Sequence, residues 1–112
     1  MTIDNVLGAE LATGRSVPPA VEGEPYESWH VISVDGRVEI GIWEVTPGSF
    51  RGETDGIYEQ MHFVAGRGTI TDADGVVTEI RAGVVMLCPD GWSGVWDVRE
   101  TIRKTYTIVK TR

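Results

Sequence analysis

The sequence predicts an all-β domain, because three features of its 112 residues indicate short strands joined by tight turns. Fourteen residues are glycine, and four of these directly follow an aspartate, a pair that tolerates positive φ in hairpin turns. Threonine and valine are frequent between the pairs, and several stretches alternate apolar with polar residues. Many short strands with glycine turns are typical of a sandwich or a barrel. The four pairs are Asp35-Gly36, Asp55-Gly56, Asp74-Gly75 and Asp90-Gly91.

The segments between these turns are the predicted strands. Residues 38–43 and 102–109 alternate with a period of two, and the other segments are short and rich in β-branched residues. Two further turns are expected at Gly66-Arg67-Gly68 and Ala82-Gly83. Only the first dozen residues have the pattern of a helical turn, and their glycines weaken it. In order, strands are expected at 29–34, 38–43, 59–65, 69–71, 76–81, 84–87, 94–98 and 102–109.

The chain is predicted to divide into an N-terminal extended arm, residues 1–27, and a β domain, residues 28–112. Residues 13–27 contain three of the five prolines, Pro18, Pro19 and Pro25, so an arm is expected there rather than a strand pair. Such an arm could lie along a sheet edge or cross to a partner chain. A loose N-terminus is the alternative, and the sequence does not decide between them.

Composition excludes several classes of function. Hydrophobic residues make up 41% of the chain, enough for one core, while the net charge of −7 disfavours binding to nucleic acid or to an anionic membrane. The single cysteine, Cys88, cannot form an internal disulfide, and we expect it to be a small buried side chain. No secretory signal and no run of roughly 18 apolar residues is visible. A soluble cytoplasmic protein is therefore expected.

Two motifs carry a resemblance to a known family. Residues 59–66, Glu-Gln-Met-His-Phe-Val-Ala-Gly, fit the pattern E-x6-G, and residues 83–91 fit G-x5-P-x-G at every position. With the later segments Trp96-Asp-Val and Arg103-Lys-Thr-Tyr, the order from 41 to 109 resembles the cupins. It is most similar to the small single-domain cupins related to ethanolamine-utilisation protein Q and to ureidoglycine aminohydrolase. The resemblance implies a jelly-roll β-barrel (a double-stranded β-helix) and a homodimer.

The resemblance also implies where a metal would bind. At the family's first two histidine positions this chain has Glu53 and Asp55, and at the histidine of the second motif it has Gly94. His62 has the opposite strand parity from Glu59, so we expect it to face away from the barrel interior. No cofactor is therefore expected. Because carboxylates suit hard ions, Glu53, Asp55 and Glu59 could bind a divalent metal weakly.

Glu59 is the strongest candidate for a catalytic residue. Strand alternation places it on the inner face with Met61, where a carboxylate is costly unless it is paired or protonated. It is either a general acid or base, or one half of an ion pair with Lys104 or Arg103. Lys104 and Tyr106 share one apolar face of the last strand, where they could hold a substrate or simply pack.

A ligand pocket is predicted around the position that lacks the histidine. Trp92, Gly94 and Trp96 have even spacing, and Trp96 could partly fill the space at Gly94 and form an apolar floor. Plain core packing is the alternative. Trp43 has the opposite parity from Ile42 and is expected to pack between sheets or at a dimer interface. The predicted pocket comprises Glu53, Asp55, Met61, Trp92 and Trp96.

Three functions follow from these residues, and the sequence leaves all three open. The first is an enzyme that converts a small polar metabolite, with Glu59 moving a proton and Lys104 and Tyr106 holding the substrate. The second is a non-catalytic module that binds a small ligand in the same pocket without metal. The third is a dimerising domain whose barrel is collapsed and plugged by Trp96. In each, nucleic acid and membrane are not expected as partners.

Overall fold

The computed structural model describes residues 2–17 and 20–112, and strands are the regular secondary structure found in them. The prediction of an all-β fold is confirmed. No helix in this described part of the chain is long and apolar enough to cross a membrane. The strands are β1 (Thr13–Ser16), β2 (Ala20–Glu22), β3 (Tyr26–Asp35), β4 (Val38–Val45), β5 (Gly48–Glu53), β6 (Ile57–Asp72), β7 (Val77–Ile80), β8 (Val85–Cys88) and β9 (Ser93–Lys110).

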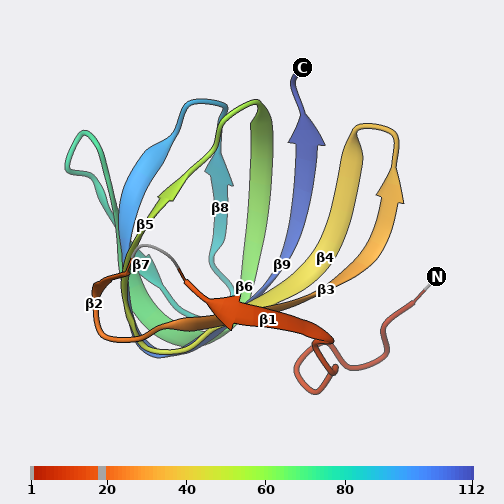
Figure 1. The fold of residues 1–112 in the computed structure, drawn as a ribbon, viewed down its shortest axis with the longest axis horizontal. Coiled ribbons are helices and arrows are strands. Elements are labelled where there is room, and N and C mark those ends of the chain that lie inside the picture. Colours follow the sequence, from red (N-terminus) through yellow and green to blue (C-terminus); the bar gives the residue numbers. More distant parts are fainter. Residues whose placement is uncertain (1, 18–19) are drawn as a thin grey trace.

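The strands form a curled antiparallel sheet in which β6 and β9 run side by side along most of their length (Figure 1). The first half of β6 pairs with β8, and the second half pairs with β7. Likewise, the first half of β9 pairs with β5, and the second half pairs with β4. One half of the sheet thus contains the first part of β6 and the second part of β9, with β8 and β4 beside them. The other half contains the remaining parts of β6 and β9, with β7 and β5, and the sheet closes on itself as a jelly-roll barrel.

The corner between the two halves lies at the segment Gly66-Arg67-Gly68. This segment is not the turn that the sequence predicted but a bulged part of β6, where the pairing with β9 shifts in register. Gly66 has a φ of 97°, and a Cβ there would overlap the carbonyl oxygen of Thr101. Such a bulge bends a strand without ending it. The two strands expected at 59–65 and 69–71 are therefore one.

The four Asp-Gly pairs do close turns, as predicted. Each lies between two consecutive strands, and each of their glycines has a positive φ, between 59° and 86°. Two pairs join strands that are hydrogen-bonded to each other, Asp35-Gly36 between β3 and β4 and Asp74-Gly75 between β6 and β7. The other two join β5 to β6 and β8 to β9, at one end of the barrel.

The N-terminal residues lie along the edges of the sheet within the same chain. β1 pairs with the outer edge of β3, and β2 pairs with β5. Further upstream, Arg103 donates hydrogen bonds to the backbone carbonyls of Val6 and Ala9, at 2.8 and 2.9 Å. Pro18 and Pro19 lie outside the described residues. No strand was predicted in this segment, whereas β1 and β2 are two short strands, each paired with an open edge of the sheet. Of the positions left open by the sequence, the one along a sheet edge is observed for these residues.

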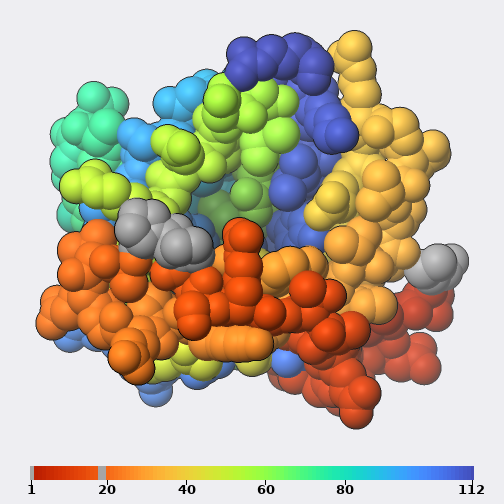
Figure 2. All heavy atoms as spheres, in the orientation of Figure 1, coloured from red at the N-terminus to blue at the C-terminus, as the bar shows by residue number. Residues whose placement is uncertain are grey.

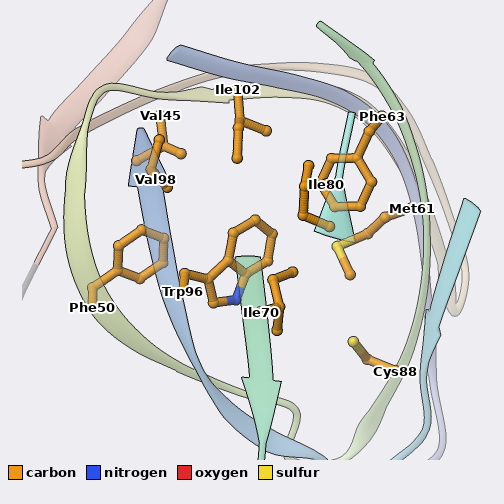
Figure 3. Packing of buried hydrophobic residues seen from close by; sticks show 10 residues of the cluster. All are labelled: Val45, Phe50, Met61, Phe63, Ile70, Ile80, Cys88, Trp96, Val98 and Ile102. Carbon is orange, nitrogen blue, oxygen red and sulfur yellow. The ribbon is translucent and has the colours of Figure 1, made fainter. Parts of the chain in front are cut away.

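The core fills one end of the barrel around Trp96 (Figure 3). The indole of Trp96 stacks on Phe50 at 5.5 Å between ring centres and meets Phe63 edge-on at 5.9 Å. Four of the ten clustered residues, Phe50, Met61, Cys88 and Trp96, also line an open cavity. The core is therefore the floor of that cavity.

Candidate functional site

A cavity of about 450 Å³ opens into the barrel from the side opposite the core. Figure 2 shows a hollow at the centre of the molecule, bordered below by the red and orange N-terminal strands and above by green and blue residues. Its walls combine aromatic rings with both signs of charge. The charged residues that line it are Arg15, Glu27, Glu39, Arg51, Glu53, Glu59 and Lys104, and the aromatic residues are Trp29, Trp43, Phe50, Trp92, Trp96 and Tyr106.

Lys104 is the central charged group of this cavity, and only 5% of it is exposed. Its Nζ lies 2.8 Å from Glu59 Oε2 and 3.0 Å from Met61 Sδ. Three aromatic rings surround the same ammonium, an arrangement that stabilises a cation through the electron-rich ring faces. The distances from Nζ to the ring centres are 4.4 Å for Trp43, 5.2 Å for Trp96 and 5.9 Å for Tyr106.

Strand register explains how these groups meet. β9 lies between β4 and β6, so Lys104 is directly opposite Trp43 on one side and Phe63 on the other. Two residues further along β9, Tyr106 is opposite Gly41 and Met61. A Cβ at Gly41 would lie 2.5 Å from the Tyr106 hydroxyl, so the glycine leaves room for the ring. Side chains opposite each other on one sheet face are in contact distance.

Tyr106 is a fixed hydrogen-bond donor in the wall. Its hydroxyl donates to Glu39 Oε2 at 2.8 Å. Burial raises the pKa of Tyr106 well above its ordinary value, and the hydrogen bond and negative charge of Glu39 raise it further. The phenol is therefore protonated at neutral pH.

The sequence analysis did not single out Glu39. Trp43 packs edge-on against Phe50 of β5 and Trp96 of β9, at 6.4 and 5.4 Å between ring centres, which agrees with the expected packing between sheets. Residues 38–43 alternate with a period of two, and the set that faces the cavity side is Glu39, Gly41 and Trp43. Ile42 is fully buried on the opposite face, so both faces of β4 carry large apolar residues and parity alone cannot tell inside from outside. The packing of Tyr106 against Gly41 shows which face of β4 points into the barrel.

Seven of the eight predicted site residues line the cavity: Glu53, Glu59, Met61, Trp92, Trp96, Lys104 and Tyr106. Asp55 does not. β5 ends at Glu53, and the side chain of Asp55 in the following turn is 80% exposed and pairs with Arg112. A second difference concerns Gly94, where Trp92 and not Trp96 fills the space, since a Cβ there would lie 2.7 Å from the Trp92 ring.

The side chains at the family's metal positions do not fit a metal ion. Within residues 2–17 and 20–112, no group of three or more histidine, cysteine or acidic side chains is arranged to hold one. Glu59 already accepts from the Lys104 ammonium, Asp55 points away, and the Trp92 ring covers Gly94. The positive charge next to Glu59 in the wall comes from Lys104 itself.

Cys88 lies in the wall but is not a nucleophile at neutral pH. It is 2% exposed. Burial raises its pKa to about 11, and the charge of Glu59 adds to this rise while Lys104 partly offsets it. Because the thiolate is the reactive form, the protonated Cys88 thiol is inert.

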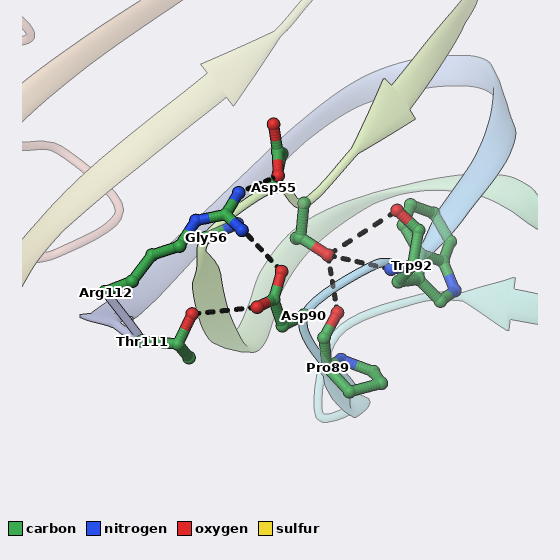
Figure 4. Close-up of polar contacts among 8 residues, drawn as sticks. Asp55, Gly56, Pro89, Asp90, Trp92, Thr111 and Arg112 are labelled. Carbon is green, nitrogen blue, oxygen red and sulfur yellow. Dashed lines mark hydrogen bonds and ion pairs between the residues drawn. The ribbon is translucent and has the colours of Figure 1, made fainter.

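Hydrogen bonds fix the loops at the cavity rim (Figure 4). The backbone N–H of Thr54 donates to the Trp92 carbonyl at 2.9 Å, and the Thr54 carbonyl accepts from the Gly91 N–H at 2.8 Å. The backbone N–H of Trp92 also donates to the Thr54 hydroxyl at 3.1 Å. Asp90 accepts from the Gly56 backbone N–H at 2.7 Å and from the Thr111 hydroxyl at 2.8 Å. The turn after β5, the turn before β9 and the C-terminus are thereby joined.

These contacts predict a pH dependence of stability at Asp90. The hydrogen bond from the Thr111 hydroxyl lowers the pKa of Asp90 below its ordinary value of 3.8, and the hydrogen bond from the Gly56 N–H adds a smaller effect in the same direction. A carboxyl whose pKa is lower in the folded state contributes stability above its unfolded pKa and loses it as the pH falls through the folded value. Asp90→Asn is therefore expected to melt below the wild type at neutral pH, with a gap that closes below about pH 4.

Melting temperatures from circular dichroism between pH 7 and pH 3 test this prediction. Asp35→Asn, in an exposed turn, is the matched control and should show no such convergence. A gap for Asp90→Asn that stays constant across the range contradicts the assignment.

Comparison with known proteins identifies the family. Residues 32–106 match the family model described as the EutQ-like cupin domain. Among solved structures, the chain is similar to EutQ of Clostridium difficile, with a TM-score of 0.67 and 18% identity over 78% of this chain and 70% of that one. It is also similar to a protein of unknown function from Pseudomonas syringae pv. tomato, with a TM-score of 0.81 and 21% identity over 94% of this chain and 46% of that one.

A predicted oxalate decarboxylase from Thermotoga maritima is a further neighbour, with a TM-score of 0.64 and 17% identity over 90% of this chain and 94% of that one. Likeness at these identities shows the fold alone. A search of the curated proteins finds no match. The family match covers well over half of the chain and agrees with the motifs and with the jelly-roll fold. The chain therefore belongs to the EutQ-like cupin family.

Proposed function

We propose that the protein binds a small polar metabolite in its barrel, where Lys104 and Tyr106 hold the metabolite and Glu59 exchanges a proton with it. The observation that carries this proposal is the Lys104–Glu59 ion pair, which lines an open cavity and is otherwise enclosed by protein. A buried ion pair is weak evidence for a role in stability, because well-packed apolar residues often stabilise as much or more. A role toward a ligand accounts for its place in the wall.

Lys104 and Glu59 each have capacity left for a ligand, and Tyr106, whose hydrogen goes to Glu39, can still accept a hydrogen bond through its hydroxyl oxygen. An ammonium has three N–H donors, and the contacts of Lys104 Nζ with Glu59 and Met61 use two. Glu59 accepts from Lys104 through Oε2, and within the described residues its Oε1 has no hydrogen-bond partner. Oε1 can therefore take a proton from an O–H or N–H group of a bound molecule, while the Lys104 charge stabilises a nearby oxygen that becomes negative.

The non-catalytic alternative uses the same cavity. A ligand-binding module needs only the shape and the polar groups of the wall, so turnover decides between the two functions. The cavity disfavours the third reading, a plugged barrel, because Trp96 packs on Phe50 at the floor and leaves the space above it open. The homodimer implied by the resemblance stays a prediction, which light scattering of the purified protein tests.

A thermal-shift screen of small polar metabolites against the wild type and Glu59→Gln tests the proposal. A ligand at 100 times its Kd should stabilise the wild type by about 2.7 kcal/mol. Any metabolite that shifts the melting temperature is then followed by NMR for conversion. Glu79→Gln, an exposed residue on β7, is the control and should behave as the wild type.

An enzyme predicts conversion that Glu59→Gln abolishes while the protein still folds. Stabilisation without conversion favours the binding module. The absence of any stabilising metabolite, or equal behaviour of Glu59→Gln and the wild type toward every metabolite, contradicts the proposal.

A further inference from the structure

We infer that Glu27, on β3, is a positioning residue for Lys104 and acts through the indole of Trp43. Neither the motifs nor the family resemblance assigns a role to Glu27. The inference rests on the proposed function only in that Lys104 is the group that meets the ligand. It adds that the orientation of Lys104 is set from the N-terminal part of the chain.

The contact between Glu27 and Trp43 is short and sheltered. Trp43 Nε1 donates to Glu27 Oε1 at 2.7 Å, and the side chain of Glu27 is 13% exposed. A hydrogen bond to an ionised carboxylate is stronger than one between neutral groups. Of the three rings around the Lys104 ammonium, that of Trp43 is the nearest, at 4.4 Å. A change in the orientation of this indole therefore changes the surroundings of Lys104 most.

The strand register places the three residues in sequence across the sheet. Trp43 on β4 is opposite Trp29 on β3 and opposite Lys104 on β9. Glu27 precedes Trp29 by two residues and so shares its face, which makes Glu27 a diagonal neighbour of Trp43. The backbone thus brings Glu27, Trp43 and Lys104 together without any loop.

Arg15 on β1 holds the other oxygen of Glu27. Its Nε lies 2.9 Å from Glu27 Oε2, and the two residues are directly opposite in the β1–β3 register. The guanidinium also lies 5.5 Å from the centre of the Trp29 ring. Because Arg15 is largely exposed, its ion pair is expected to be weak, so the bond to the indole carries most of the positioning.

The chain has only two lysines, Lys104 and Lys110, which allows a direct test. Native protein is treated briefly with acetic anhydride, and peptide mass spectrometry gives the ratio of acetylation at Lys104 to that at Lys110. Lys110, exposed at the end of β9, is the internal standard. In Glu27→Ala the ratio should rise about tenfold, because the charge-assisted hydrogen bond that holds the Trp43 ring against the Lys104 ammonium is lost.

Three variants separate positioning from a general loss of stability. Glu27→Gln keeps an acceptor for the indole and should restore a ratio near that of the wild type. Trp43→Phe should raise the ratio, and the double variant Glu27→Ala with Trp43→Phe should match Trp43→Phe alone, because Glu27 acts only through Trp43. Glu24 is an exposed acidic residue just before β3, and Glu24→Ala should leave the ratio unchanged.

The indole N–H signals in a ¹H–¹⁵N NMR spectrum give a second readout. Trp43→Phe assigns the Trp43 signal, which should move in Glu27→Ala and stay in place in Glu24→Ala. An unchanged acetylation ratio in Glu27→Ala overturns the inference. So does a ratio in Glu27→Gln that equals that of Glu27→Ala, or an additive double variant.

The two hypotheses fail in different experiments. If no metabolite binds the wild type, the proposed function is wrong, whereas the acetylation ratios still report on the position of Lys104. If metabolites bind but Glu27→Ala leaves the ratio unchanged, only the positioning role is wrong.

Discussion

Replacing Lys104 with methionine is expected to destabilise the folded protein by about 3 kcal/mol, because it leaves the Glu59 carboxylate without its counter-charge. Methionine keeps the length of the side chain, so packing against the rings is largely preserved. The remaining carboxylate, 16% exposed, then lies between Met61 and aromatic rings with little access to water. Urea unfolding monitored by tryptophan fluorescence gives the free energy of unfolding.

Two further variants make this prediction specific. Lys110→Met, at the exposed end of β9, should change the free energy of unfolding by less than about 0.5 kcal/mol. The double variant Lys104→Met with Glu59→Gln removes both charges and should recover much of the lost stability while it still fails to bind ligand. If Lys104→Met costs no more than Lys110→Met, Lys104 and Glu59 do not form a buried pair.

Gly66→Ala is expected to destabilise the protein by at least about 3 kcal/mol, since two effects combine at this position. Gly66 has a φ of 97°, a conformation that side chains rarely adopt, and its added Cβ would overlap the Thr101 carbonyl of the adjoining β9. That overlap is with backbone, which cannot move without opening the corner where β6 and β9 pass from one half of the barrel to the other.

Gly75→Ala isolates the first of these effects, the backbone strain. Gly75 has a similar φ of 83°, but nothing lies within 4 Å of a Cβ placed there. The backbone strain alone should destabilise Gly75→Ala by about 1–2 kcal/mol. Equal free energies of unfolding for the two variants would show that the close approach to Thr101 has no effect on stability.

Local chemistry made the frame of this fold predictable. The Asp-Gly pairs favour turns, and the spacing of Glu59 to Gly66 and of Gly83 to Gly91 resembles that of one known family of barrels. The ion pair of Glu59 with Lys104 could also be predicted, because strand alternation puts Lys104 on the inner face. The other candidate partner, Arg103, lies one residue away on the opposite face, where it pairs with Glu44 at 3.0 Å.

The remainder of the site depends on information that a single strand does not contain. β4 is apolar on both faces, so the inward direction of Glu39 and Trp43 follows only from its neighbours β3 and β9. Glu27 and Arg15 reach the cavity because β1 pairs with β3, a pairing that no motif signals. Asp55 was placed by counting along a family pattern, whereas β5 in this chain ends two residues earlier.

The NMR spectrum of the lysine ammonium groups tests directly whether Lys104 and Glu59 form the ligand-contacting pair inside the barrel. An ammonium held by a carboxylate in a sheltered site exchanges its protons slowly with water and gives a resolved ¹H–¹⁵N signal. With two lysines in the chain, we expect one such signal, from Lys104, which disappears in Glu59→Gln and shifts when a stabilising metabolite binds. Two ammonium groups that exchange equally fast, or a Lys104 signal that Glu59→Gln leaves unchanged, would contradict this pairing.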